Sequence, residues 1–132
     1  MAVSDIDSLC YSPRPSTEMR EDIPQGTLDM LILRTLATAG SGQLHGFEIA
    51  SAIETVSSRV FVVEEGSLYP ALQRMLVQGW IAGEWGRTAD NRRARYYRIT
   101  ASGRKQLERA LKSYGRVSQA IAAILDITPR GT

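Results

Sequence analysis

The chain has 132 residues and a nearly balanced charge, with 16 Lys and Arg against 14 Asp and Glu. Its 43% of hydrophobic and 23% of charged residues are typical of one folded domain and exclude global disorder. The longest stretch without Asp, Glu, Lys or Arg is residues 35–47, shorter than the roughly 18 apolar residues of a membrane span. The single Cys10 and the single His45 exclude an intrachain disulfide and a zinc site built from these side chains.

The same residues argue against export and against catalysis. Asp5 and Asp7 lie where a secretory signal would carry positive charge, so we expect a cytoplasmic bacterial protein without a membrane partner. No nucleophile beside a base, no paired carboxylates in a polar loop and no glycine-rich phosphate loop occurs. We therefore do not expect an enzyme, and we expect neither a cofactor nor a metal.

The small net charge conceals a basic block. Residues 84–116 contain ten basic and three acidic residues, a local balance of +7, whereas residues 1–83 have a balance of −5. A block of this kind attracts polyanions through its local field. For residues 104–116 a solvated helix face is an equally good interpretation.

The first half of the chain predicts an arm, two helices and a short strand. Residues 1–24 contain three prolines and no sustained apolar period, which is typical of a flexible arm. From about residue 27, apolar residues at helical spacing predict a buried helix that ends near Gly40.

A second helix is indicated after His45, which we expect to support the turn before it. The apolar face of this helix would contain Ile49, Ile53 and Val56. The β-branched and aromatic run at 60–63 is too short for a helix and predicts a small strand.

A third helix follows, with one apolar face made by Leu68, Leu72, Met75 and Leu76. Proline is tolerated only near the start of a helix, so Pro70 places that start around residues 65–67. Gly79 is expected to end the helix, as glycine often does.

Two strands at 80–85 and 93–99, joined by the polar turn 88–91, predict a β-hairpin with an arginine-rich tip. Trp80 and Trp85 are expected to be wedged between this hairpin and the helices.

A last helix begins after Thr100, a residue suited to cap it, and runs to about residue 125. We assign residues 100–126 to a dimerisation helix and residues 127–132 to a tail. The apolar residues of this helix advance largely by alternating steps of three and four, as in a coiled coil. The predicted dimer interface consists of Leu107, Ala110, Leu111, Tyr114, Val117, Ile121, Ile124 and Leu125. Packing against its own domain stays open, but apolar residues on more than one side favour a second subunit.

The predicted fold is mainly α with a small β-hairpin (α+β), in the order of a winged helix-turn-helix over residues 25–99 with an additional C-terminal helix. In that fold the third helix enters the DNA major groove and the hairpin reaches adjacent phosphates or the minor groove. The candidate DNA-contacting residues are Ser67, Tyr69, Pro70, Gln73 and Arg74 on the helix and Asn91, Arg92, Arg93 and Arg95 at the hairpin. Gln73 and Arg74 could instead be solvated, and Arg95 could pair with Glu84.

Three segments resemble the signatures of PadR-type transcriptional regulators. The recognition-helix segment reads GSLYPALQRM at 66–75, followed by GWI at 79–81, and the other two read LHGFEI at 44–49 and RARYYRITASG at 93–103. The resemblance covers about residues 25–125 and points to the short branch of the family, with a single C-terminal helix.

This resemblance implies a homodimeric repressor that binds a palindromic operator in double-stranded DNA. It also implies release by a small aromatic or cationic effector, whose site the residues do not locate. The alternative function is a winged-helix module that binds an acidic protein partner without binding DNA.

Overall fold

The computed structural model describes residues 25–127, so the predicted arm at 1–24 and residues 128–132 of the predicted tail lie outside the described residues. Within that range the four helices and the hairpin follow the predicted order, the short strand lies elsewhere than predicted, and the α+β class is confirmed. The elements are α1 (Gln25–Ala37), β1 (Leu44–His45), α2 (Gly46–Val56), α3 (Glu65–Gln78), β2 (Ile81–Arg87), β3 (Arg93–Ile99) and α4 (Ala101–Leu125).

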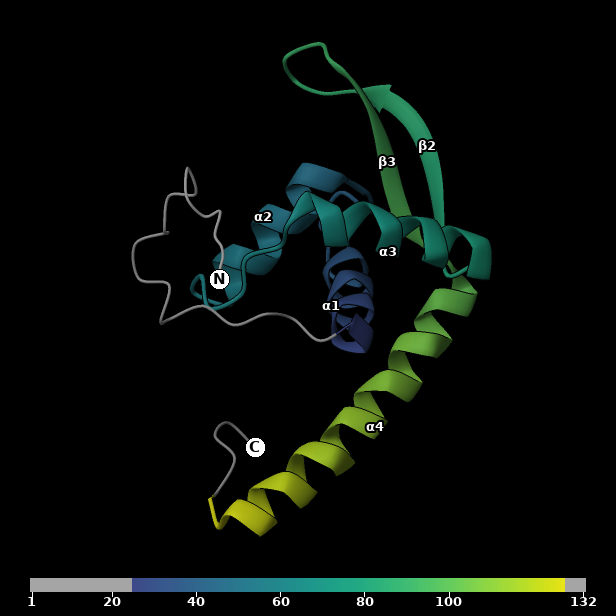
Figure 1. Cartoon of the computed structure of the whole chain (residues 1–132). Helices are drawn as coiled ribbons and strands as arrows, with labels where there is room; N and C mark the ends of the chain where they lie inside the picture. The colour runs from purple at the N-terminus through teal and green to yellow at the C-terminus, as the bar shows by residue number, and fades with distance from the viewer. Residues whose placement is uncertain (1–24, 128–132) are drawn as a thin grey trace.

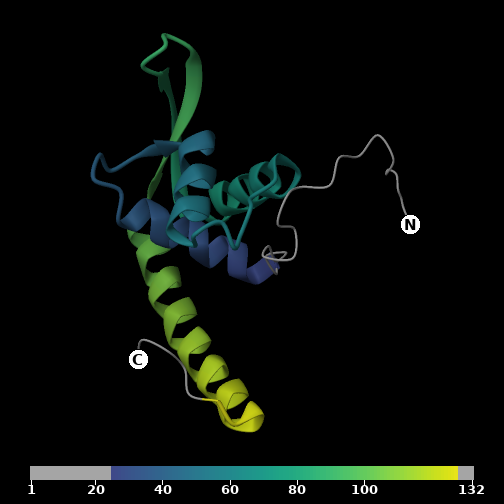
Figure 2. The same cartoon turned by 90° about the vertical axis from the view of Figure 1, so that its left-hand side faces the viewer.

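The described residues form a helical body with extensions at two ends. Helices α1, α2 and α3 pack together, and the β2–β3 hairpin rises from them on one side (Figure 1). Helix α4 leaves the base of the hairpin and runs in the opposite direction, as both views show (Figure 2). The hairpin tip and the far end of α4 are therefore the two extremes of the fold.

The core lies where the three helices meet the base of the sheet. Ile32 on α1, Ile49 on α2, and Leu72 and Met75 on α3 are fully buried. Burial of each such side chain contributes about 1.5–3 kcal/mol to folding. Leu107 of α4 joins the same core, which fixes the first turns of α4 on the body.

The sheet has the order β1-β3-β2 and is antiparallel throughout. The strand that joins the hairpin in this sheet is β1, in which Leu44 pairs with Tyr97 and His45 pairs with Tyr96 of β3. The prediction of a strand at 60–63 was wrong, because within it only Phe61 forms a single bridge. Val63 is buried in the core, and its N–H donates to the Glu54 carboxylate at 3.2 Å. The apolar run thus reflects core packing of a loop.

Helix α4 begins where it was predicted. Thr100 caps it by accepting a hydrogen bond from the Gly103 N–H at 3.0 Å. The Thr100 hydroxyl also donates to the Gly79 carbonyl at 2.7 Å, and its N–H donates to the Trp80 carbonyl at 3.0 Å. The residue that starts α4 is therefore also bonded to the link between α3 and β2.

Candidate nucleic-acid interface

Helix α3 exposes most of the candidate DNA-contacting residues that were predicted on it. Its start at Glu65 lies within the predicted range, and Gly79 in the left-handed region ends it. Leu68, Leu72 and Met75 are buried, which confirms three residues of the predicted apolar face. The polar side of the helix is left facing solvent, with exposed residues Ser67, Tyr69, Pro70 and Gln73.

Pro70 lies in the second turn of α3, where it lacks the N–H that would bond to the Gly66 carbonyl. The exposed start of the helix therefore keeps a carbonyl acceptor that regular helical bonding does not use. Tyr69 stands beside it, and its hydroxyl lies against Gly46 at the start of α2: a Cβ at Gly46 would be 2.7 Å from Tyr69 Oη. Any side chain at position 46 would therefore displace the Tyr69 ring.

Arg74 does not join the other candidate residues. Its Nη2 atom lies 2.8 Å from Oδ1 of Asp29 on α1, and the Arg74 side chain is 42% exposed. The guanidinium is held against the helical body, so reaching a DNA base would require breaking this ion pair.

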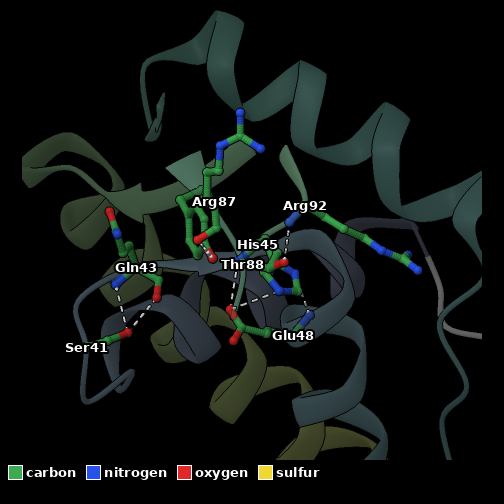
Figure 3. A network of polar contacts seen from close by, with 8 residues as sticks. Ser41, Gln43, His45, Glu48, Arg87, Thr88 and Arg92 are labelled. Atoms are coloured by element: carbon green, nitrogen blue, oxygen red, sulfur yellow. Dashed lines mark hydrogen bonds and ion pairs between the residues drawn. The ribbon is translucent and has the colours of Figure 1, made fainter. Parts of the chain in front are cut away.

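The hairpin tip is ordered by its own hydrogen bonds. The Thr88 hydroxyl accepts from the Arg92 N–H at 3.1 Å, and Asn91 adopts the left-handed backbone conformation with φ of 65°. The Asn91 carbonyl accepts from the Arg87 guanidinium at 3.1 Å. Figure 3 shows the Arg87 and Arg92 side chains leaving this turn in different directions. Asn91 thus shapes the turn, while Arg92 is exposed.

Arg93 and Arg95 line the same side of the hairpin in different ways. The Arg93 guanidinium lies 4.3 Å from the ring centroid of Trp85, a cation–π contact. Trp85 is 57% exposed, so the prediction that it is wedged against the helices was wrong; Trp80, in contrast, packs on the core. Arg95 lies over Gly83 instead of pairing with Glu84. Its Nε atom is buried and has no hydrogen-bond partner among residues 25–127.

The start of α2 completes the site. His45 caps α2 in a reciprocal capping box with Glu48, whose carboxylate accepts from the His45 N–H at 3.0 Å (Figure 3). The predicted supporting role of His45 is therefore confirmed. Phe47 follows it and is 74% exposed, a residue that the sequence reasoning missed. The available signal was its position outside the Ile49–Ile53 apolar face.

These parts line one concave surface between the start of α2, α3 and the hairpin, and the cleft that it encloses has a volume of about 550 Å³. The structure thereby brings Tyr69 together with Arg92, Arg93 and Arg95, residues separated by more than twenty positions in sequence. Ser67, Pro70, Gln73 and Asn91 lie outside its lining. The lining residues are His45, Gly46, Phe47, Tyr69, Trp85, Thr88, Arg92, Arg93, Ala94, Arg95 and Tyr97.

The predicted dimer face of α4 divides into two parts. Leu107 is buried in the core of its own chain, and Ala110 is half-buried. The other six residues have exposed fractions of 42–83%, and we call them the apolar stripe. The apolar stripe consists of Leu111, Tyr114, Val117, Ile121, Ile124 and Leu125.

An exposed helix beside a basic hairpin on a helix-turn-helix body defines a winged-helix DNA-binding protein. The family model for the transcriptional regulator PadR-like family matches residues 35–109. The chain therefore belongs to the PadR-like family of transcriptional regulators.

Individual relatives match most of the chain. An uncharacterized protein from Lysinibacillus sphaericus is 30% identical over 108 residues, covering 82% of this chain and 96% of the relative. A transcriptional regulator from Clostridium thermocellum has a TM-score of 0.67 and 28% identity, covering 75% of this chain and 93% of that one. A PadR-like transcriptional regulator from Bacillus cereus has a TM-score of 0.64 and 30% identity, covering 76% and 93%. The winged-helix class is thereby confirmed.

The described residues contain neither a metal-ion cluster nor a membrane-spanning helix. Across residues 25–127 no group of three or more His, Cys, Asp or Glu side chains is placed to hold a metal ion. In the same range no helix has the length and apolar character needed to cross a bilayer.

Proposed function

We propose that the protein is a homodimeric repressor that binds a palindromic operator in the cytoplasm. The concave surface between α2, α3 and the hairpin carries this proposal, because three arginines converge there on an exposed recognition helix. The family assignment favours this function over a protein-binding module without DNA contacts.

In this function α3 reads the major groove and the hairpin holds the backbone. Ser67, Tyr69 and Gln73 present hydroxyl and amide groups that can bond to base edges or phosphates, while Pro70 offers an apolar contact. Arg92 and Arg93 neutralise phosphates. Arg95 lines the same concave surface, so its guanidinium adds a third positive charge beside the phosphates.

The dimer would form through the apolar stripe of α4. Its six large apolar side chains are 42–83% exposed in the single chain. Covering them with the same face of a second copy removes this surface from water. The resulting two-fold symmetry would present two α3 helices to inverted half-sites roughly 34–36 Å apart.

We also propose that a small-molecule effector binds in an apolar groove between α1 and α2 and releases the DNA. It encloses about 490 Å³, within the range of small-molecule pockets, and contains Leu31, Phe61 and the end of α2. Val56, predicted to lie on the buried face of α2, is 85% exposed at its edge. The lining holds Arg34 but neither Asp nor Glu, so the groove suits an aromatic or anionic aromatic compound better than a cation.

The DNA-binding part is tested by selecting bound fragments from genomic DNA and measuring affinity against salt. The slope of log affinity against log salt is negative, and each lost phosphate contact reduces its magnitude by about 0.9. Arg92→Ala with Arg93→Ala should therefore reduce this magnitude by about 1.8, and the control pair Arg59→Ala with Arg104→Ala should leave it unchanged. An unchanged slope in the hairpin variant, or selected fragments without inverted symmetry, would contradict the proposal.

The dimer is tested by light scattering after gel filtration at micromolar concentration. The wild type should have twice the chain mass, and Ile121→Glu in the apolar stripe should have the mass of one chain. Gln119→Glu, on the polar side of the same helix, should remain dimeric. A wild-type protein of single-chain mass would remove this part of the proposal.

The groove is tested with an anionic naphthalene sulfonate dye. Its fluorescence should rise on binding, and the dye should release bound DNA. Ala52→Phe, which fills the groove, should abolish both effects while leaving DNA affinity unchanged. Equal dye binding by this variant would place the site elsewhere.

A further inference from the structure

Helix α4 carries a second charged feature that the proposed function does not use. Lys105, Arg109, Lys112 and Arg116 follow one another at steps of four, three and four residues, which places them on one face of the helix. All four are exposed, and at 1.5 Å per residue they span about 16 Å. We call these four residues the basic row.

The basic row is not neutralised within the described chain. Glu108 is the single acidic residue of α4, and none of the salt bridges among residues 25–127 involves it or a member of the row. The one polar bond of the row runs from Arg109 to the Gln106 side chain at 2.8 Å. Like charges three and four residues apart destabilise a helix, and a bound polyanion relieves that repulsion.

The basic row faces away from the apolar stripe. Arg116 and Ile121 are five residues apart, which corresponds to about 140° around the helix axis. The row therefore stays exposed when the apolar stripe is covered by a second copy. Because α4 runs away from the hairpin tip, a straight duplex lying on α3 and the tip does not reach along the row (Figure 1).

We propose that the basic row binds the phosphate backbone of a second nucleic-acid duplex, without reading its sequence. The charges are complementary, and a straight row of about 16 Å can lie beside several phosphates, since each strand carries one phosphate per 3.4 Å or so of helix axis. This inference goes beyond the proposed function, since it requires neither an operator nor a dimer.

The surroundings of the row favour a nucleic acid over other anionic partners. A protein partner would need a buried aromatic or aliphatic anchor at the centre of the contact. The row itself consists of four cations and contains no such anchor. An anionic bilayer would take up the apolar stripe of α4, which would turn the basic row on the opposite side toward water. Phosphate contacts alone do not require an apolar anchor.

The test uses the full chain and a random duplex in the Arg92→Ala, Arg93→Ala background, which weakens the hairpin contacts. Adding Arg109→Gln with Arg116→Gln should reduce the magnitude of the negative slope of log affinity against log salt by about 1.8, at about 0.9 per contact. The control pair Arg59→Gln with Arg104→Gln removes the same charge from exposed sites outside the row and should leave the slope unchanged. Equal losses from both pairs, or no binding in the parent background, would overturn the inference.

A capture assay tests whether the duplex at the row is a second one. The wild-type protein held on a biotinylated duplex should retain a labelled random duplex at low salt. Arg109→Gln with Arg116→Gln should lose the labelled duplex and keep the first, whereas Arg92→Ala with Arg93→Ala should weaken the first. The inference fails if the row variant retains the labelled duplex. It also fails if the wild type binds phosphatidylserine vesicles and the row variant loses that binding while it keeps the labelled duplex. In both cases the proposed function stands.

Discussion

Gly103 in the first turn of α4 gives the sharpest test of the fold. A Cβ at this position would overlap the carbonyl oxygen of Trp80 and lie 2.9 Å from Cγ1 of Ile99. The Trp80 oxygen is backbone and also accepts the Thr100 N–H, so it cannot move freely. Overpacking of this kind costs about 1–3 kcal/mol, and a strained hydrogen bond adds about 1 kcal/mol. The usual helical gain from Gly to Ala offsets about 1 kcal/mol.

We therefore expect Gly103→Ala to lower the free energy of unfolding by about 1–3 kcal/mol. For a domain of this size that corresponds to a fall in Tm of roughly 4–12 °C. Gly115→Ala in the same helix is the matched control, because apart from the helix's own backbone and adjacent residues no described atom lies within 4 Å of its Cβ position. It should raise the free energy of unfolding by up to about 1 kcal/mol.

The assay is urea unfolding followed by circular dichroism at one fixed protein concentration, with thermal melts alongside. The prediction concerns the sign as well as the size, since the same chemical change is made twice in one helix. If both variants are more stable than the wild type, or if they differ by less than about 1 kcal/mol, the packing of Gly103 against the Trp80 carbonyl is refuted.

Two further predictions concern the DNA-facing side, and a third concerns the pH dependence of stability. Gly46→Ala places a methyl group 2.7 Å from Tyr69 Oη and should displace that ring, which lowers operator affinity at least tenfold in a gel-shift assay while stability changes little. Arg74→Ala and Asp29→Ala should each lower the free energy of unfolding by less than about 1 kcal/mol, because the ion pair between them is partly exposed. Both variants should keep the operator preference of the wild type. A relaxed sequence preference in Arg74→Ala alone would show that Arg74 reads DNA. Burial raises the pKa of the Tyr97 hydroxyl above its ordinary value of 10.0, so the unfolded chain loses its proton first and stability falls as pH rises beyond about 10. Tyr97→Phe should make that decline shallower in urea unfolding at pH 9 to 11, and an equally steep decline would contradict the assignment.

The elements that could be predicted are those fixed by local signals. The start of α4 follows from the side-chain oxygen of Thr100, and the end of α3 follows from the backbone freedom of Gly79. The buried face of α3 follows from the spacing of Leu68, Leu72 and Met75. Each signal acts within a few residues, so reading it does not require the tertiary structure.

The features that were missed depend on distant partners. Arg74 and Asp29 are 45 positions apart, and nothing local shows that α1 offers a carboxylate to α3. Leu44–His45 pairs with the edge of β3 that β2 does not occupy, whereas in the more strand-like run at 60–63 Val63 is buried in the core and Phe61 packs against it. Trp85 is 57% exposed, and its ring lies beside the Arg93 guanidinium, eight positions further along the chain.

Thr100 connects the two halves of the proposed mechanism. Its hydroxyl bonds to the Gly79 carbonyl and to the Gly103 N–H, so the end of α3, the base of the hairpin and the start of α4 share one residue. Leu107 extends that attachment into the core. If two copies pair through the apolar stripe, the direction in which α4 leaves this anchor sets the distance between the two α3 helices. A small rotation of α4 about Thr100 would then change the half-site spacing that the dimer can bind, which gives an effector near α1 a physical route to DNA release.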